Sequence, residues 1–431
     1  MTAAVYVETM SRRAPAADAA QSRPIPKVEW IAAGLCVIQM TEPVFAAIFV
    51  SQGIFEPQPI ARYMWAPVYL FLICVLVRDW RQVLAMAPRT VLLGLLALLC
   101  WASFQWSVSP GDTLRRSFGL SMAMAFSLYL AWRYDWRQML LLLTGAWLAM
   151  IVGCYVFATA FNPWHVMRDE HPGAWSGLWT HKNSLASIMA FGCGVLLSAA
   201  IMDRKIRPWA LMGLVGAFLL ILLSTGRTAL LAVAAGIGTA GLFWAMRRGP
   251  VTMVTLTASG LAFAIILGGV MLIAPQLLVE IIGRDLTFTG RTDIWESLVR
   301  AVEARPVLGY GFGAFWIDEY GPRYWVQRDV AWKVIGAHNS WLEVLIALGA
   351  VGLAVLMIQL AVMFWRVLRF GLDPIAGVYP PILLAMTLVY TLSESYLLQA
   401  NIFWLLYVAV AAKLAVAARP APGVLASSRS D

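Results

Sequence analysis

The stretch "IGAHNSWLEVLIALGAVGLAVLMIQLAVMFW", residues 335–365, contains the feature that decides the fold of this chain. From Asn339 to Trp365 it is almost entirely apolar, and it exceeds the roughly 20 residues that a helix needs to cross a bilayer. A histidine, an asparagine and a serine stand at the start of this run. The pattern predicts a membrane helix with a polar entrance, and it raises the question of what an imidazole does there.

The whole chain has the composition of a protein that crosses a membrane many times. Of its 431 residues, 61% are hydrophobic and only 13% are charged, whereas a soluble domain is about half apolar and about a quarter charged. We therefore expect an all-α integral membrane protein with about twelve transmembrane helices. The apolar runs that predict them are 30–51, 61–77, 89–106, 115–132, 137–160, 182–202, 208–224, 228–246, 251–274, 339–365, 375–392 and 397–417.

Basic residues in the short loops predict the orientation of these helices. With the N-terminus inside, nineteen Lys and Arg residues fall in the cytoplasmic loops and tails. Apart from Arg227 and the long loop, the opposite loops hold five, namely Arg62, Arg115, Arg116, Arg168 and Lys182. This asymmetry favours a topology in which both termini are cytoplasmic. It also accounts for the net charge of +9, so we do not expect nucleic acid as a partner.

This topology divides the chain into five segments. Residues 1–27 and 418–431 are predicted as cytoplasmic tails, residues 28–274 as transmembrane helices 1–9 and residues 339–417 as helices 10–12. Residues 275–338 are predicted as one large periplasmic loop, in which "TGRTDIWESLVRAVEARP" has the periodicity of a short amphipathic helix. The first 27 residues lack the apolar core of a signal peptide.

Two arginines on the predicted outer face are candidates for binding an anion. The tetrapeptide Thr-Gly-Arg-Thr occurs twice, at 225–228 and 289–292, each time at the start of a predicted helix. Arg227 and Arg291 would present two planar guanidinium groups beside helix-end amides, which suits a diphosphate. The plainer interpretation of each arginine is an anchor at the membrane surface.

Two histidine-containing stretches lie on the same face. In "GLWTHKNSLASI", His181 and Lys182 open a helix, where they either cap it or add positive charge to the anion site. In the opening stretch, His338 and Asn339 open the next helix, and Glu343 follows one turn later, close enough in sequence to orient the imidazole. Because imidazole titrates near neutral pH, His338 is a candidate base for a hydroxyl group. The plainer interpretation is again a helix cap.

Several other polar residues complete the candidates. Glu42 and Glu394 lie inside apolar runs, where a carboxylate is costly and indicates a functional site, an ion pair or a water-filled cavity. Tyr310 lies within the glycine-rich "GYGFG", residues 309–313, and Arg305 precedes it by four residues. The sequence contains no P-loop and no DxD pair in an outer loop, and its five cysteines lack metal-ligand spacing. We therefore expect neither a metal nor a cofactor.

Four stretches in order resemble the O-antigen ligase / Wzy-type polymerase family, and in particular its exopolysaccharide-polymerase branch. They are "GLWTHKNSLA", "STGRTALLA", "GRTDIWESLVRAVEARPVLGYGFGAFW" and "AHNSWLEVLIALGAVGL". The resemblance implies a C-type glycosyltransferase-like fold in the bacterial inner membrane and an active site on the periplasmic face. It implies that the catalytic residues are Arg227, Arg291 and His338. We expect contacts with substrate from Lys182, His181, Asn339, Glu343, Arg305, Tyr310 and Glu394.

The function implied by this resemblance is a metal-independent transfer of glycan from an undecaprenyl-diphosphate carrier. A polymerase would join such lipid-linked repeats into exopolysaccharide or O antigen; a ligase would transfer them to lipid A core. The expected partners are the donor, a glycan acceptor and membrane lipid, together with a chain-length regulator. A transporter of lipid-linked oligosaccharides is the alternative from another class. The concentration of polar residues at one face and the absence of clear pseudo-symmetric halves disfavour it.

Overall fold

A computed structural model of the chain describes residues 24–43, 63–160, 166–167, 171–256, 258, 291–318, 320–330 and 334–417. Within these residues the chain is mostly helical, and its β structure there is an isolated antiparallel bridge between Val166 and Trp175. The all-α prediction is confirmed. Residues 1–23, 275–290 and 418–431, to which we assigned most of the tails and the first part of the large loop, lie outside the described residues.

Each apolar run carries a helix wherever the run is described. The helices are α3 (Lys27–Gln39), α5 (Ala66–Arg78), α6 (Trp80–Met86), η3 (Ala87–Arg89), α7 (Val91–Ala102), η4 (Ser103–Gln105), α8 (Pro110–Arg133), α9 (Trp136–Ala160), α10 (Lys182–Met202), α11 (Arg207–Leu223), α12 (Arg227–Arg248), α15 (Arg291–Ala304), α16 (Pro322–Val330), α17 (Ser340–Phe370), α18 (Tyr379–Thr391) and α19 (Ile402–Ala417). The predicted amphipathic helix is α15. The short helices α6 and α16 were not predicted.

Four helices among the described residues are long and apolar enough to cross a membrane: α9 over Trp136–Thr159, α10, α12 and α17. A fifth span results if the pair Trp80–Arg89 and Val91–Gln105, bent by 98°, is counted as one. The shorter apolar helices are Tyr63–Arg78, Arg207–Leu223, Tyr379–Thr391 and Ile402–Ala417. The chain is thus a helical membrane protein, and the total of twelve spans stays a prediction.

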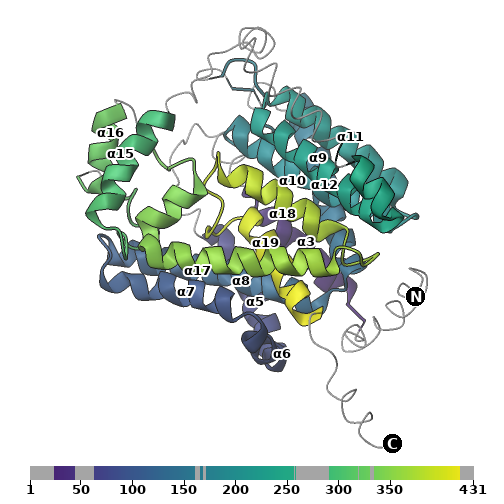
Figure 1. Cartoon of the computed structure of the whole chain (residues 1–431), viewed down its shortest axis with the longest axis horizontal. Coiled ribbons are helices and arrows are strands. Elements are labelled where there is room, and N and C mark those ends of the chain that lie inside the picture. Colours follow the sequence, from purple (N-terminus) through teal and green to yellow (C-terminus); the bar gives the residue numbers. More distant parts are fainter. Residues whose placement is uncertain are drawn as a thin grey trace, which may run out of the picture.

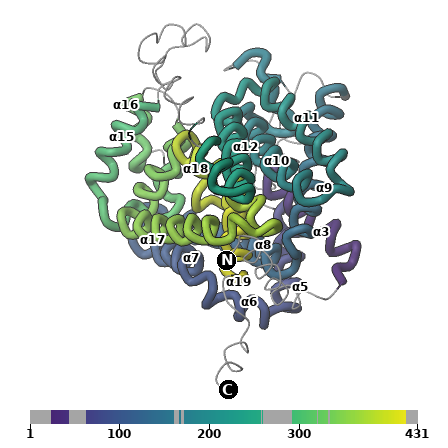
Figure 2. The backbone as a smooth tube through the Cα atoms, turned by 45° about the vertical axis from the view of Figure 1, so that its right-hand side comes forward, coloured from purple at the N-terminus to yellow at the C-terminus, as the bar shows by residue number. Residues whose placement is uncertain are grey.

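Helix α19 forms the centre of the bundle. Its residues from Ile402 to Ala415 are all buried, as expected of a helix that is apolar on every side. It packs against α8, α17 and α18 (Figures 1 and 2). Helices α9, α10, α11 and α12 form the neighbouring part of the bundle, and α15 and α16 lie together near the start of α17. The C-terminal helix therefore organises the fold.

A break in α17 holds the glycine-rich segment against the membrane helix. Gly349 has φ +62°, and a Cβ there would lie 2.3 Å from backbone atoms of Val307. At this break four backbone hydrogen bonds join 306–311 to 346–351: Tyr310 N–H to Ile346 O, Gly311 N–H to Ala347 O, Ala350 N–H to Pro306 O and Val351 N–H to Val307 O. Only glycine fits both the left-handed backbone and the close approach.

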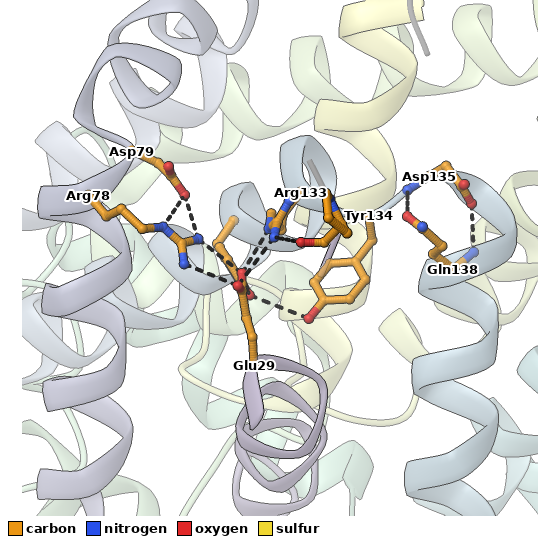
Figure 3. A network of polar contacts seen from close by, with 9 residues as sticks. Glu29, Arg78, Asp79, Arg133, Tyr134, Asp135 and Gln138 are labelled. Atoms are coloured by element: carbon orange, nitrogen blue, oxygen red, sulfur yellow. Dashed lines mark hydrogen bonds and ion pairs between the residues drawn. The ribbon is translucent and has the colours of Figure 1, made fainter. Parts of the chain in front are cut away.

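A buried carboxylate fastens three helices at one end of the bundle. Glu29 of α3 is 6% exposed and accepts hydrogen bonds from Arg78 of α5 and from Arg133 and Tyr129 of α8 (Figure 3). Burial alone would raise the pKa of this carboxyl, but the hydrogen bonds from Arg133, Arg78 and Tyr129 outweigh burial and lower it to about 2. Glu29 is therefore ionised at neutral pH and joins α3 to α5 and α8.

Further basic residues from the predicted cytoplasmic loops gather at this same end, which we call the basic end. Arg137 pairs with Asp203 after α10, Arg247 donates to the carbonyl of Gly371 after α17, and Lys413 donates to carbonyls of Ala131 and Tyr134. Helices α10, α12 and α17 all finish here, so they begin at the opposite end. Lys182, Arg227 and His338 stand at those beginnings.

Candidate active site

His338 stands in a strained turn immediately before α17. Its φ is +47°, a left-handed conformation that costs a non-glycine residue about 1 kcal/mol. The backbone on both sides is fixed: the N–H of Ala337 donates to Glu343, and the side chain of Asn339 caps α17 by accepting from the N–H groups of Trp341 and Leu342. Asn339 therefore caps α17, and the imidazole of His338 does not.

The imidazole contacts a carboxylate that comes from another helix end. Nδ1 of His338 lies 3.3 Å from Oε2 of Glu394, in the segment after α18. The other oxygen of Glu394 is 3.3 Å from Nη2 of Arg291, whose Nη1 donates to the carbonyl of Ser393 at 2.6 Å. A neutral imidazole that donates from Nδ1 to this carboxylate has its lone pair on Nε2, as a base requires.

The three side chains are partly open to water. His338 is 31% exposed, Arg291 is 19% exposed and Glu394 is 14% exposed. Ser340 holds the carboxylate in place, because its hydroxyl donates to the carbonyl of Glu394 at 2.7 Å and accepts from the N–H of Tyr396. The site thus combines a base, a cation and a carboxylate, and it remains accessible to a substrate.

Glu343 does not orient the imidazole directly, which corrects the expectation from the sequence. Its carboxylate accepts hydrogen bonds from the indole of Trp316, the N–H of Ala337 and the hydroxyl of Ser395. These three donors come from the glycine-rich segment, the residue before His338 and the residue after Glu394. Glu343 therefore joins the segments that carry the acid–base pair. Glu343 lies one helical turn into α17. At that position its side chain points toward these segments and away from the imidazole of His338.

The other predicted cations lie at the starts of α10 and α12. Nζ of Lys182 donates to Oγ1 of Thr225 at 3.1 Å, two residues before the exposed Arg227. Gly226 allows this approach, since a Cβ there would lie 2.4 Å from Cβ of Ala186 in α10. Two helix N-termini and two cations are thus neighbours, and helix N-termini favour bound anions.

Helix α10 connects this pair of cations to the His338 site. One turn after Lys182, the hydroxyl of Ser187 accepts a 2.8 Å hydrogen bond from Tyr396. The N–H of Tyr396 in turn donates to Ser340, which holds Glu394. Neither Ser340 nor Tyr396 was predicted. The signal for Tyr396 was its place beside Glu394 in an otherwise apolar run.

Three of the predicted substrate contacts already have structural partners. Nδ1 of His181 caps α10 by accepting from the N–H of Asn183, which is the plainer interpretation of that histidine. The guanidinium of Arg305 lies over the ring of Tyr310, and the Tyr310 hydroxyl donates to Ala301 of α15. None of the contacts given within the described residues joins Arg305 or Tyr310 to His338. The contacts of these three residues with substrate stay a prediction.

Known proteins resemble the part of the chain that contains these residues. Residues 212–357, which include Arg227, Arg291 and His338, match the family model described as O-antigen ligase. Over 322 residues the chain is 26% identical to the exopolysaccharide production protein ExoQ of Rhizobium meliloti, an alignment that covers 71% of this chain and 70% of that protein. The chain is therefore similar to the O-antigen ligase / Wzy-type family of membrane proteins that process polysaccharides, over the part that carries Arg227, Arg291 and His338.

Proposed function

We propose that this protein is a metal-independent glycosyltransferase that polymerises undecaprenyl-diphosphate-linked oligosaccharide repeats at the periplasmic face of the inner membrane. The observation that carries the proposal is the contact of His338 with Glu394, which also pairs with Arg291. A base, a carboxylate that supports it and a phosphate-binding cation are the groups that such a transfer needs.

The topology supports a periplasmic site. The basic residues of the predicted cytoplasmic loops gather around Glu29, Asp203 and Gly371, whereas His338 and Lys182 stand at the opposite helix ends. Because cytoplasmic loops are enriched in Lys and Arg, the basic end is assigned to the cytoplasm. With this assignment the site lies on the periplasmic face, where we propose that the lipid-linked repeats and the acceptor meet.

The chemistry follows from the two sets of cations and the base. His338 takes the proton from the acceptor hydroxyl, and the oxygen forms a bond to the anomeric carbon while the bond from that carbon to the diphosphate breaks. Arg291, Arg227 and Lys182 bind the diphosphate leaving group and stabilise its charge. Glu394 stabilises the imidazolium formed in this step. An in-line attack of this kind inverts the configuration at the anomeric carbon.

The similarity to ExoQ supports a protein that makes polysaccharide, for which we propose a polymerase, while the family description keeps a ligase as the second candidate. ExoQ is named for exopolysaccharide production and aligns with 71% of the chain, whereas the O-antigen ligase model covers residues 212–357. A ligase would use the same donor and the same base, and it would differ in transferring the glycan to lipid A core.

The test is the polysaccharide of a strain that carries His338→Ala, with Glu296→Gln on the exposed face of α15 as the control. For a polymerase we expect polymer to vanish and single lipid-linked repeats to accumulate, at an unchanged level of protein in the membrane. Polymer of normal length that stays on its lipid carrier would identify a ligase instead. Normal polymer in both strains would refute the role of His338.

A further inference from the structure

A second polar feature adjoins the candidate site, on the other side of residues 394–396. A cavity of about 780 Å³ lies between the starts of α8 and α10 and the segment 395–403. This volume is within the range of about 300–1,000 Å³ that is usual for small-molecule sites. The residues that characterise its lining are Trp65, Tyr69, Trp179, Tyr396, Arg116 and Gln399.

Arg116 brings a positive charge to this cavity. Its side chain is exposed there, and no hydrogen bond or ion pair joins it to another described residue. The two carboxylates whose charges act on Arg116, those of Asp112 and Glu343, are engaged elsewhere. Asp112 binds the neighbouring Arg115 and the hydroxyl of Ser109, and Glu343 accepts three hydrogen bonds. A cation in a partly enclosed cavity gains from an anionic partner, which a ligand can supply.

The aliphatic part of Arg116 is held in place by the glycine-rich segment. A Cβ on Gly313 would lie 2.3 Å from Cδ of Arg116, so the absence of a side chain at Gly313 makes room for the arginine. Gly313 has φ +66°, a conformation that glycine adopts without strain. The guanidinium is therefore positioned by the fold, in the manner of a binding group and unlike a mobile surface arginine.

The rest of the lining suits a sugar. The ring of Tyr396 stacks on Phe403 with centroids 4.0 Å apart, and Trp65 stacks on Tyr69. Flat aromatic walls of this kind pack against the C–H faces of pyranose rings. Gln399 and the carboxylate of Glu42 line the same cavity, and among the described residues neither side chain has a hydrogen-bond partner. Both can bind hydroxyl groups.

From these features we propose that the cavity binds an acidic saccharide of the glycan substrate, with Arg116 bound to its carboxylate. That this saccharide is part of a substrate rests on the proposed function. An arginine–carboxylate pair is bidentate and geometrically specific. The cavity would thus select repeats that carry a uronic acid or a comparable anionic group, at a place next to His338 and Glu394.

The experiment measures binding to the purified full-length protein in lipid nanodiscs. The probes are trigalacturonate and its fully methyl-esterified form, and the signal is the intrinsic fluorescence of the tryptophans, two of which line the cavity. The variants are Arg116→Met, Arg116→Lys and, as control for the loss of one positive charge, Arg369→Met in α17 at the basic end. Elution as a single symmetrical peak shows that each variant is folded.

We expect the wild type to bind the acid about tenfold more tightly than the ester, a preference of the size that one charge-assisted pair supplies. Arg116→Met should lose this preference, Arg116→Lys should keep part of it and Arg369→Met should keep all of it. Equal binding of acid and ester by the wild type would overturn the proposal. So would displacement by inorganic pyrophosphate at lower concentration than by trigalacturonate, because the cavity would then be a diphosphate site.

The same titration on His338→Ala separates this inference from the proposed transfer. A variant that binds trigalacturonate normally but makes no polymer supports both. If His338→Ala still makes polymer while Arg116→Met loses the preference for the acid, the proposed catalytic role fails and the acidic-saccharide site stands. If polymer is lost in His338→Ala and Arg116→Met binds acid and ester as the wild type does, the site fails alone.

Discussion

Oε2 of Glu394 lies 3.3 Å from Nδ1 of His338, although the two residues are 56 positions apart in the chain. One precedes α17 and the other follows α18, so the ends of two packed helices bring them together. The contact sets the orientation of the imidazole of His338. Among the described residues of the candidate centre, this is the side chain that suits general-base catalysis. The contact therefore decides which substitutions should affect transfer.

Replacing Glu394 by glutamine should slow the transfer without preventing substrate binding. The amide keeps the size and can accept a hydrogen bond, but it no longer supplies the negative charge that stabilises an imidazolium. We expect a fall in kcat of about 100-fold, in line with the effects of removing a supporting hydrogen-bond partner, with KM changed much less. The measurement is polymer formation from lipid-linked repeats in a reconstituted membrane.

Two further variants test whether Glu394 acts through its charge. Glu394→Asp keeps the carboxylate and should recover part of the activity. Glu296→Gln removes a carboxylate that is 79% exposed on α15 and should leave the rate unchanged. A rate for Glu394→Gln equal to that of the wild type would show that the imidazole works without this partner.

Replacing Arg291 by lysine should impair activity although the charge is kept. The guanidinium uses one nitrogen for the carbonyl of Ser393 and another for Glu394, while its remaining donors stay open to substrate. An ammonium group cannot make both contacts in the same geometry. We expect at least about a tenfold loss of transfer, which is the size of one lost charge-assisted hydrogen bond. Arg300→Lys on the exposed face of α15 is the matched control.

Replacing Glu29 by glutamine should destabilise the protein and leave the chemistry of each folded molecule intact. The substitution leaves Arg78 and Arg133 close together without the carboxylate that neutralises them. Loss of one member of a buried charge cluster costs about 3 kcal/mol. The unfolding temperature in detergent should fall relative to Glu303→Gln on α15, whereas polymer formed per folded molecule should match the wild type.

The contribution of Glu29 to stability should depend on pH in the acid range. Its pKa of about 2 lies below the ordinary value of 4.5, so the folded state favours the ionised form. The stabilisation is complete above about pH 4.5 and is lost as the pH falls through 4.5 toward 2. The difference in unfolding temperature between wild type and Glu29→Gln should stay constant from neutral pH down to about pH 5 and shrink below it. A difference that grows with acidity would contradict this assignment.

Replacing Gly349 by alanine should disturb the glycine-rich segment and, through it, the site. The new Cβ would collide with the backbone of Val307 in a conformation that already disfavours alanine. We expect a destabilisation of about 3 kcal/mol and loss of polymer. Gly238→Ala in α12 adds the same atom where nothing lies within 4 Å, and it should be tolerated. The amount of protein in the membrane and its unfolding temperature report both effects.

The sequence predicts the helices well because each apolar run has the length and composition of a buried or membrane helix. It also predicts α15, from Ile294, Leu298 and Val302 at helical spacing, and the Thr-Gly-Arg-Thr repeats point to Arg227 and Arg291. Glu343 was considered as the residue that orients His338 because the two are close in sequence. The residue in contact with the imidazole is Glu394, which packing of α17 and α18 brings there. Arg116 was counted only as a loop charge, since a cavity is visible only after the helices are assembled.

The four hydrogen bonds beside Gly349 bear on which residues of this chain can vary. Those four bonds use only main-chain atoms, so the segment 306–311 is docked on α17 regardless of which side chains it carries at most positions. Side chains of this segment can then change while His338 keeps its distance from Glu394. Main-chain bonds of this kind allow the sequence of residues 306–311 to vary while the geometry of the candidate centre is preserved.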